Sequence, residues 1–179
     1  MKVTPTSIPD VLLIEPKVFG DSRGFFFESF NQREFNAATA TNFNLVQENY
    51  SRSKKGVLRG LHYQLGRPQG KLIRVARGSV FDVAVDIRPA SPHFGKWVGI
   101  ELNEHDNFQL WLPPGLAHGF LVLSESADFV YKTTDYYAPE LEHCISWNDT
   151  EIGIDWPLDG DPTLSAKDIA GKAFKNAQF

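Results

Sequence analysis

The sequence predicts an all-β protein, which would be a sandwich, a jelly roll or a barrel. About ten short runs of strand-forming residues follow one another along the chain. Gly, Pro, Asn and Asp separate these runs, and only two short stretches have helical character. The chain has 179 residues, which is the usual length of one domain. Residues 1–179 are therefore expected to form a single domain with a substantial core.

The first half of the chain is expected to contain four strands, at Val11–Glu15, Phe25–Phe30, Phe43–Asn49 and Val57–Gln64. The turn-forming cluster Gly20–Gly24 precedes the phenylalanine-rich strand, and Gln32–Ala38 is a candidate short helix. The period of two in a strand places Gln47 and Asn49 on one face. The polar, basic segment Ser51–Gly56 is expected to be a loop.

The second half is expected to contain six strands and a short helix at Ser165–Phe174. The clearest alternation in the chain is in the strand Ser79–Ile87, where small and acidic residues alternate with large apolar ones. This pattern indicates a strand with two different environments on its two faces. The other strands are predicted at Lys71–Arg77, Trp97–Leu102, Phe108–Leu112, Gly119–Leu123 and Asp128–Thr134.

The composition excludes several classes of protein. The net charge is −4, whereas a nucleic-acid-binding protein usually has an excess of basic residues. The single cysteine, Cys144, cannot form an internal disulfide and fits a reducing compartment. We find neither a signal-peptide pattern nor an apolar run of about 18 residues that would cross a membrane. We therefore expect a cytoplasmic protein.

Polar side chains recur in segments that are otherwise typical of core strands. Taken alone, Arg59 would be an exposed strand residue and His62 a core histidine with satisfied hydrogen bonds, which is the commoner case for a single histidine. The recurrence of such groups favours instead a polar interior, and a barrel of this size can hold one small ligand. The other polar residues of this kind are Glu28, Gln47, Asn49, Lys71, His118 and Tyr131.

Arg59 and His62 are three residues apart, so a regular strand would point them to opposite faces. If both face a ligand, the strand must break its alternation between them. Gly60 lies in this interval and is the candidate site of a bulge.

The polar residue types suit the removal of a proton next to a ketone. A neutral histidine is a natural base near pH 7, and a tyrosine can return a proton from the other side. A lysine or an arginine can stabilise the enolate oxygen that forms in between. Together these groups could invert the configuration of a carbon atom beside a carbonyl group.

Six longer motifs follow in order along nearly the whole chain. With these motifs the chain resembles the dTDP-4-dehydrorhamnose 3,5-epimerase family. The motifs are Phe19–Glu28 (FGDSRGFFFE), Val57–His62 (VLRGLH), Gln69–Leu72 (QGKL), Phe81–Arg88 (FDVAVDIR), Pro114–Phe120 (PGLAHGF) and Trp147–Asp149 (WND).

The resemblance implies a double-stranded β-helix barrel of the cupin kind with a few short helices. It implies a homodimer that uses no cofactor and converts dTDP-4-dehydro-6-deoxy-D-glucose into dTDP-4-dehydro-β-L-rhamnose, with neither nucleic acid nor membrane as a partner. Two alternatives stay open. One is an epimerase that acts at only C3 or only C5 of a related deoxysugar nucleotide, and the other is a non-catalytic cupin that binds a sugar nucleotide.

The resemblance also assigns roles to residues of this chain. His62 resembles the general base, Tyr131 the acid on the opposite face of the sugar ring, and Lys71 the group that stabilises the enolate. Asp168 resembles the carboxylate that orients His62. The residues implied to contact the substrate are Arg23, Phe26, Glu28, Gln47, Asn49, Arg59, His118, Glu142 and Lys167, with Tyr137 stacking on the thymine.

Asp168 also has an interpretation without catalysis. Ser165–Asp168 is typical of a helix start, with Ser165 as the cap and Asp168 near the amides of the first turn. The residues alone favour the cap, and the resemblance favours the histidine partner. Asp82 and Asp86 are the alternative partners for His62.

A protein-bound metal is the main competing chemistry, and we expect none. Metal-binding cupins typically carry two histidines one residue apart, whereas Tyr63 and Gln64 follow His62. Cys144 is expected to be an inert residue of the core, and Arg52–Lys55 is either a phosphate contact or a solvated loop. The remaining histidines are expected in exposed, turn-like segments, at His93, His105 and His143.

Overall fold

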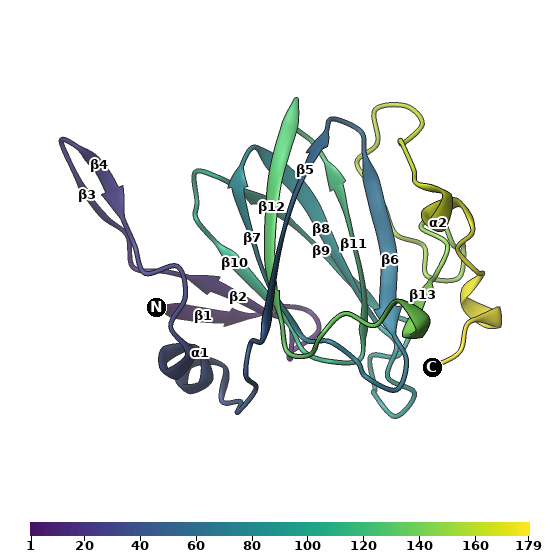
Figure 1. Cartoon of the computed structure of the whole chain (residues 1–179). Helices are drawn as coiled ribbons and strands as arrows, with labels where there is room; N and C mark the ends of the chain where they lie inside the picture. The colour runs from purple at the N-terminus through teal and green to yellow at the C-terminus, as the bar shows by residue number, and fades with distance from the viewer.

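A computed structural model describes all 179 residues, and two facing sheets form the body of the molecule (Figure 1). The first sheet has six strands in the order β1-β2-β10-β7-β12-β5. All its neighbouring strands are antiparallel. The strands are β1 (Lys2–Pro5), β2 (Leu12–Glu15), β5 (Gln47–Lys54), β7 (Lys71–Arg77), β10 (Gln109–Leu112) and β12 (Ser126–Thr133).

The second sheet has five antiparallel strands in the order β13-β6-β11-β8-β9. From β5 to β13 the chain changes sheet at every connection except the one between β8 and β9. This connectivity is that of a jelly roll, so the predicted all-β barrel of the cupin kind is confirmed. The strands are β6 (Leu58–Gln64), β8 (Ser79–Asp86), β9 (Trp97–Asn103), β11 (Leu116–Val122) and β13 (Glu142–Cys144).

The remaining elements lie outside the two sheets. The hairpin of β3 (Phe19–Asp21) and β4 (Gly24–Phe26) projects away from the body (Figure 1). The helices are α1 (Gln32–Thr39) and α2 (Ala166–Ile169), and 3₁₀ turns occupy Pro139–Leu141 and Phe174–Asn176. No helix of the structure combines the length and the apolar character that a bilayer crossing requires.

Apolar side chains fill one end of the space between the sheets. Phe120 on β11 stacks on Phe129 on β12, with ring centroids 4.0 Å apart. Val80 and Ala84 belong to the same buried cluster, whereas Asp82 lies between them on the same face of β8. Asp82 therefore interrupts an otherwise apolar face of β8 inside the barrel.

Apolar layers also cover the outer face of the five-stranded sheet and part of the outer face of the six-stranded sheet. Val83 and Val85, on the other face of β8, pack in one cluster with Trp156 and Phe174 from the C-terminal segment. On the six-stranded sheet, Phe35 of α1 packs edge-on against Trp111 with ring centroids 4.9 Å apart. The sheets are thus held between two apolar layers, which fixes their strands around the polar end of the barrel.

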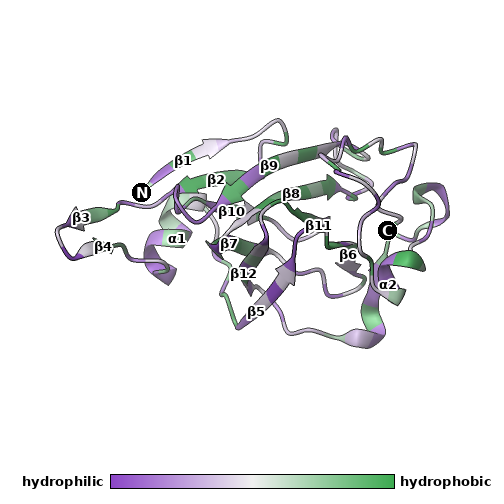
Figure 2. Ribbon diagram, turned by 90° about the horizontal axis from the view of Figure 1, so that it is seen from above, coloured by the Kyte–Doolittle hydropathy of each residue, from purple (hydrophilic) through white to green (hydrophobic).

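Several of the predicted segments are wrong in extent. The predicted strand Phe43–Asn49 begins only at Gln47, and the predicted helix Ser165–Phe174 is an α-helix only over Ala166–Ile169. Ser51–Gly56 is not a loop, because β5 begins at Gln47 and continues to Lys54. The residues of β5 are polar on both faces of the strand, and Figure 2 shows β5 mostly in the hydrophilic colour. The strand therefore lacks the apolar alternation of a core strand. The predicted strand Phe25–Phe30 ends at Phe26, and all three residues of β4 are exposed.

Candidate active site

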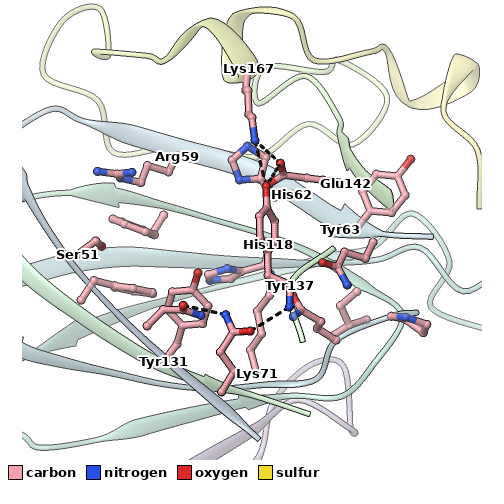
Figure 3. Close-up of a pocket in the computed structure, with 18 of the residues that line it drawn as sticks. Ser51, Arg59, His62, Tyr63, Lys71, His118, Tyr131, Tyr137, Glu142 and Lys167 are labelled. Atoms are coloured by element: carbon pink, nitrogen blue, oxygen red, sulfur yellow. Dashed lines mark hydrogen bonds and ion pairs between the residues drawn. The ribbon is translucent and has the colours of Figure 1, made fainter. Parts of the chain in front are cut away.

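A cavity of about 430 Å³ opens between the sheets at the polar end of the barrel (Figure 3). Strands of both sheets and the C-terminal helix α2 contribute side chains to its walls. All but three of the predicted site residues line it, namely Gln47, Asn49, Arg59, His62, Lys71, His118, Tyr131, Tyr137, Glu142, Lys167 and Asp168.

The predicted irregularity at Gly60 is present, and it brings Arg59 and His62 to the same cavity. The register between β6 and β11 shifts between His118 and Phe120, opposite this point. Gly60 has a φ of +126°. A Cβ atom at this position would lie 2.5 Å from the Cα atom of Gly119. Only glycine therefore allows β6 to pass so close to β11.

Asp168 fills both of the roles that the sequence suggested. Its Oδ2 accepts hydrogen bonds from the backbone N–H of Ser165 at 3.0 Å and from the Ser165 hydroxyl at 2.6 Å. The Asp168 N–H donates to Oγ of Ser165 at 3.3 Å, and together with the Ser165 N–H bond this forms the capping box of α2. Its Oδ1 accepts a hydrogen bond from the Gly60 N–H at 2.9 Å and lies 3.0 Å from Nε2 of His62. The helix cap thus places the carboxylate against the histidine.

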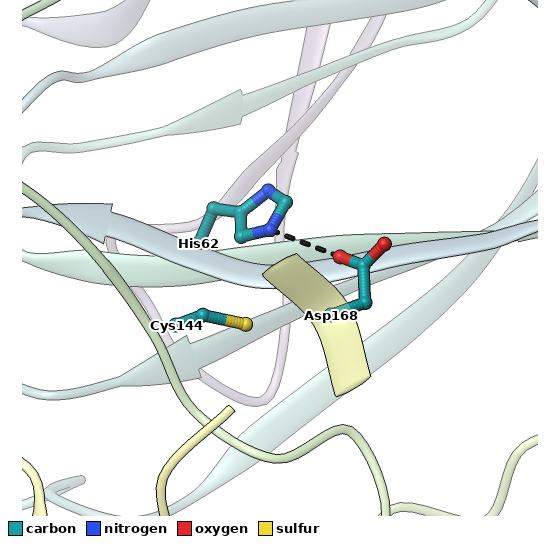
Figure 4. Close-up of side chains that lie close together, drawn as sticks. All are labelled: His62, Cys144 and Asp168. Atoms are coloured by element: carbon teal, nitrogen blue, oxygen red, sulfur yellow. Dashed lines mark ion pairs between the residues drawn. The ribbon is translucent and has the colours of Figure 1, made fainter. Parts of the chain in front are cut away.

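His62 and Asp168 are in direct contact, but the geometry is not that of a well-aligned hydrogen bond. Nε2 of His62 is buried, and no acceptor lies in the direction of its N–H bond. Nδ1 lies on the far side of the ring from Asp168 (Figure 4). Burial opposes ionisation of Asp168, but His62, Ser165 and Gly60 together hold the pKa of its carboxyl group well below the usual range.

The alternative partners of His62 are engaged elsewhere. Asp82 is fully buried, and its Oδ2 lies 2.9 Å from Nε2 of His118. Asp86 accepts hydrogen bonds from Arg88 and Ser91. His118 and Asp82 therefore form a second histidine–aspartate pair, which the sequence reasoning did not foresee. The alternating pattern of β8 could have indicated it, because it points Asp82 into the barrel.

Lys71 is a buried cation without a carboxylate of its own. Burial lowers the pKa of its ammonium group to about 8, although the negative charges of Asp82 and Glu142 partly oppose this shift. Those two carboxylates pair with His118 and Lys167. Lys71 is thus free to respond to a negative charge that develops in the cavity.

Tyr131 on β12 and His62 on β6 belong to different sheets, so they approach the cavity from different walls (Figure 3). Burial is the main reason that the pKa of the Tyr131 phenol is raised above its ordinary value, and the charge of Glu142 adds to the shift. The phenol is therefore protonated at neutral pH and can act as a proton donor.

A polar network closes the rim of the cavity beside His62. The Tyr137 hydroxyl donates a hydrogen bond to Glu142 at 2.7 Å, and Lys167 pairs with the same carboxylate. The ammonium of Lys167 also lies 5.9 Å from the centre of the Tyr137 ring. The Tyr137 backbone N–H donates to Gln47 at 3.0 Å, which ties the rim to β5.

The polar face of β5 continues beyond the residues that the sequence singled out. Ser51 also lines the cavity. The hydroxyl of Ser53 is the acceptor for two N–H groups of Arg59, at 3.2 and 3.1 Å. The period of two that joins Gln47 to Asn49 leads on to both serines, but the expectation of a loop at Ser51–Gly56 hid it.

Three predicted substrate contacts lie outside this cavity. Arg23 and Phe26 are on the β3–β4 hairpin and Glu28 follows it, and all three are exposed. The guanidinium of Arg23 pairs with Asp21 in the same hairpin. Nothing in the sequence indicates that this segment leaves the body, because its phenylalanines are typical of a core strand.

Two expectations about competing chemistry need correction. His143 does not lie in a turn but on β13, where its ring stacks on Tyr63 with centroids 5.5 Å apart. Cys144 is only partly buried and lies beside His62 and Asp168, so it is not a residue of the core. His93 and His105 do lie in turns, with His93 half-buried and His105 exposed.

Comparison with known proteins decides the family of this chain. The sequence profile described as dTDP-4-dehydrorhamnose 3,5-epimerase matches residues 5–176. The chain belongs to this epimerase family. A Pseudomonas aeruginosa protein named dTDP-4-dehydrorhamnose 3,5-epimerase is 60% identical over 177 residues, covering 99% of this chain and 98% of the relative.

Solved structures of family members share the whole fold. The Legionella pneumophila 3,5-epimerase, in complex with dTDP-4-keto-L-rhamnose, has a TM-score of 0.97 and 51% identity over 99% of this chain and 94% of its own. A 3′-monoepimerase from Streptomyces bikiniensis, in complex with dTDP-quinovose, has a TM-score of 0.88 and 36% identity over 94% of this chain and 86% of its own.

Proposed function

We propose that this epimerase inverts C3 and C5 of dTDP-4-dehydro-6-deoxy-D-glucose to give dTDP-4-dehydro-β-L-rhamnose, in the biosynthesis of dTDP-L-rhamnose. The observation that carries the proposal is one cavity with His62 and Tyr131 on different walls and the buried Lys71 between the sheets. Family membership makes the chain an isomerase, and relatives of up to 60% identity bear the name of this activity.

The geometry supports one role for each of four side chains. Neutral His62 takes the proton from the carbon beside the C4 ketone with Nδ1, while Nε2 stays against Asp168. The charged Asp168 then stabilises the imidazolium that forms. Lys71 compensates the negative charge on the enolate oxygen, in a site where burial makes that interaction strong. Tyr131 delivers a proton to the opposite face of the ring.

The nucleotide is bound by cations and one aromatic ring. Arg59 uses one edge of its guanidinium for Ser53 and keeps other N–H groups for the diphosphate, which it can bind with two parallel hydrogen bonds. Lys167 adds a second positive charge at the rim. Tyr137, held by Glu142 and Gln47, is placed there to stack on the thymine.

A homodimer would explain the three predicted contacts that lie outside the cavity. The hairpin exposes Phe25 and Phe26 to 64% and 69%, and isolated phenylalanines on a projecting arm are stabilised when a partner covers them. We propose that the hairpin reaches the cavity of a second copy and brings Arg23, Phe26 and Glu28 to its substrate.

An epimerase that acts at a single carbon is the second candidate. The specific observation in its favour is the 3′-monoepimerase with the same fold. The residue types of the cavity suit both reactions, because one base and one acid are enough for either. We favour the double inversion because relatives named for it are more similar to this chain.

Proton NMR of dTDP-4-dehydro-6-deoxyglucose in heavy water tests the function. The protein is first treated with a chelator, since we propose that no metal or other cofactor takes part. Deuterium should enter at both C3 and C5, and a downstream reductase should trap the L-sugar. Exchange at one carbon would identify the monoepimerase, and no exchange at either would leave a sugar-nucleotide-binding cupin.

The variant His62→Ala is the control for the same experiment. It removes the only histidine that contacts Asp168, so exchange should be lost at both carbons. Exchange at the wild-type rate in this variant would contradict the assignment of the base. The cytoplasmic location of the enzyme stays a prediction.

A further inference from the structure

Cys144 lies against the pair of His62 and Asp168. A ring nitrogen of His62, Sγ of Cys144 and a carboxylate oxygen of Asp168 lie within 4.8 Å of one another (Figure 4). The sheet explains this proximity, because Cys144 on β13 is directly opposite His62 on β6. Side chains of directly opposite residues in an antiparallel pair lie on the same face. None of the proposed catalytic steps uses the thiol.

The donor atoms of this cluster have little other engagement. Nε2 of His62 is buried and has no hydrogen-bond partner. The thiol of Cys144 makes only a weak hydrogen bond, to the backbone carbonyl of Ile145 at 3.4 Å. Oδ1 of Asp168 accepts one hydrogen bond, from Gly60, and has a further lone pair. A buried nitrogen without a well-aligned hydrogen bond is a reason to look for a further ligand.

We propose that His62, Cys144 and Asp168 form an inhibitory binding site for one thiophilic divalent cation of the Zn²⁺ or Cd²⁺ class. A nitrogen, a thiolate and a carboxylate with water in the fourth position is a ligand set that zinc accepts. Hard cations such as Mg²⁺ and Ca²⁺ prefer sites made of oxygen atoms and are not expected to bind.

The required movement is small. In a tetrahedral zinc site, neighbouring ligand atoms lie about 3.3–3.8 Å apart, as follows from Zn–N, Zn–O and Zn–S distances of about 2.0–2.3 Å. Nε2 of His62 and Oδ1 of Asp168 are already 3.0 Å apart. Sγ of Cys144 must approach by about 1 Å, which a rotation about one side-chain bond provides.

Metal binding changes the protonation of the thiol. Burial raises the pKa of the Cys144 thiol to about 12, so in the absence of metal it is protonated and does not disturb the base. On binding, the metal loses water molecules, the S–H proton passes to solvent and a metal–sulfur bond forms. The proton on Nε2 of the neutral imidazole moves to Nδ1, which frees the Nε2 lone pair for the metal and leaves Nδ1 unable to accept a proton. The metal then separates His62 from Asp168 and occupies Nε2, so the imidazole no longer has its carboxylate partner.

Titration of the chelator-treated protein with Cd²⁺ tests the site without reference to catalysis. Cys144 is the only cysteine, so an ultraviolet thiolate-to-cadmium charge-transfer band reports this position alone. We expect the band to saturate at one equivalent in the wild type and to be absent in Cys144→Ser. In His62→Asn it should require at least about tenfold more Cd²⁺. No band in the wild type, or equal affinity in His62→Asn, would overturn the proposal.

Inhibition of catalysis by Zn²⁺ is a second, separate test, and it rests on the proposed epimerase activity. The wild type should lose its activity on addition of Zn²⁺ and recover it with EDTA. Cys144→Ser should keep the metal-free activity, and its half-inhibitory Zn²⁺ concentration should rise at least about tenfold. Equal inhibition of both proteins would place the inhibitory metal elsewhere and overturn the proposal. Absence of epimerase activity in the metal-free wild type would count against the function, while the Cd²⁺ band would still decide the site.

Discussion

Lys71 destabilises the fold that holds it. Its pKa falls from an ordinary value of 10.5 to about 8 because burial disfavours the ammonium ion. Between these two values the unfolded chain binds more protons than the folded one, so stability rises with pH through this window. Below pH 8 the folded protein bears the full penalty of a buried charge, which no direct ion pair offsets.

Replacement of Lys71 by methionine should therefore stabilise the protein while it removes activity. We expect the free energy of unfolding in urea at pH 7 to increase by about 1–3 kcal/mol, as a pKa shift of this size implies. At pH 10.5 the gain should be much smaller, because wild-type Lys71 is then neutral. A variant that is less stable than the wild type at pH 7 would show that Lys71 has a partner in the fold.

The same titration predicts an alkaline limit of catalysis. As the pH rises through about 8, Lys71 loses the charge that compensates the enolate, so kcat should fall. Tyr131 cannot cause this limb, because its pKa lies above the ordinary value for a phenol. In Lys71→Arg, whose charge persists, the limb of the pH–rate profile should move to higher pH. If the alkaline limb of the pH–rate profile is unchanged in Lys71→Arg, a group other than Lys71 causes the fall in kcat.

The strand β6 depends on a residue that has no side chain. Gly60→Ala should destabilise the protein by about 2–4 kcal/mol, because the backbone is in the left-handed region and the new Cβ atom would collide with β11. Gly56→Ala is the matched control, since Gly56 also has positive φ but no atom within 4 Å of its Cβ position. It should cost about 1–2 kcal/mol. If urea denaturation shows that Gly60→Ala and Gly56→Ala lose the same free energy of unfolding, the contact of the new Cβ atom with β11 is relieved by a shift of the backbone.

The strands that the sequence predicts well are those with one apolar and one polar face. Ser79–Ile87 is an example, because its two faces meet the barrel interior and the C-terminal layer. β5 is predicted poorly, because one of its faces meets solvent and the other meets a polar cavity. Neither of these two environments requires apolar side chains. The hairpin of β3 and β4 is missed because its phenylalanines join no core of the chain, and Phe25 stacks only on the neighbouring Phe27.

The site was predictable where the chemistry requires an unusual residue in a strand. His62, Lys71 and Tyr131 stand out in this way, and all three line the cavity. Residues that act through others were harder to find. Asp168 has a complete explanation as a helix cap, and only the fold shows that its second oxygen meets His62. For Asp82 and Ser53 the period of two indicates the face of the strand, but only the fold shows that their partners are His118 and Arg59.

The molecule as a whole has one feature that a single chain does not explain. Its two sheets are covered by α1 and by the C-terminal segment, yet the β3–β4 hairpin remains outside with exposed phenylalanines. If two copies exchange these hairpins by a twofold axis, each cavity is completed by the other subunit. A defect in the pocket of one chain would then disable the cavity of that chain, whereas a defect in its hairpin would disable the cavity of its partner.

Mixing two inactive variants tests this arrangement. His62→Ala lacks the base but has an intact hairpin, and Arg23→Ala has the converse defect. In a mixed dimer one cavity combines an intact pocket with an intact hairpin, so unfolding and refolding the two variants together should restore roughly one quarter of the wild-type activity. Each variant refolded alone should stay inactive. If the hairpin serves its own chain, or the enzyme is a monomer by sedimentation, the mixture will remain inactive and the shared site is wrong.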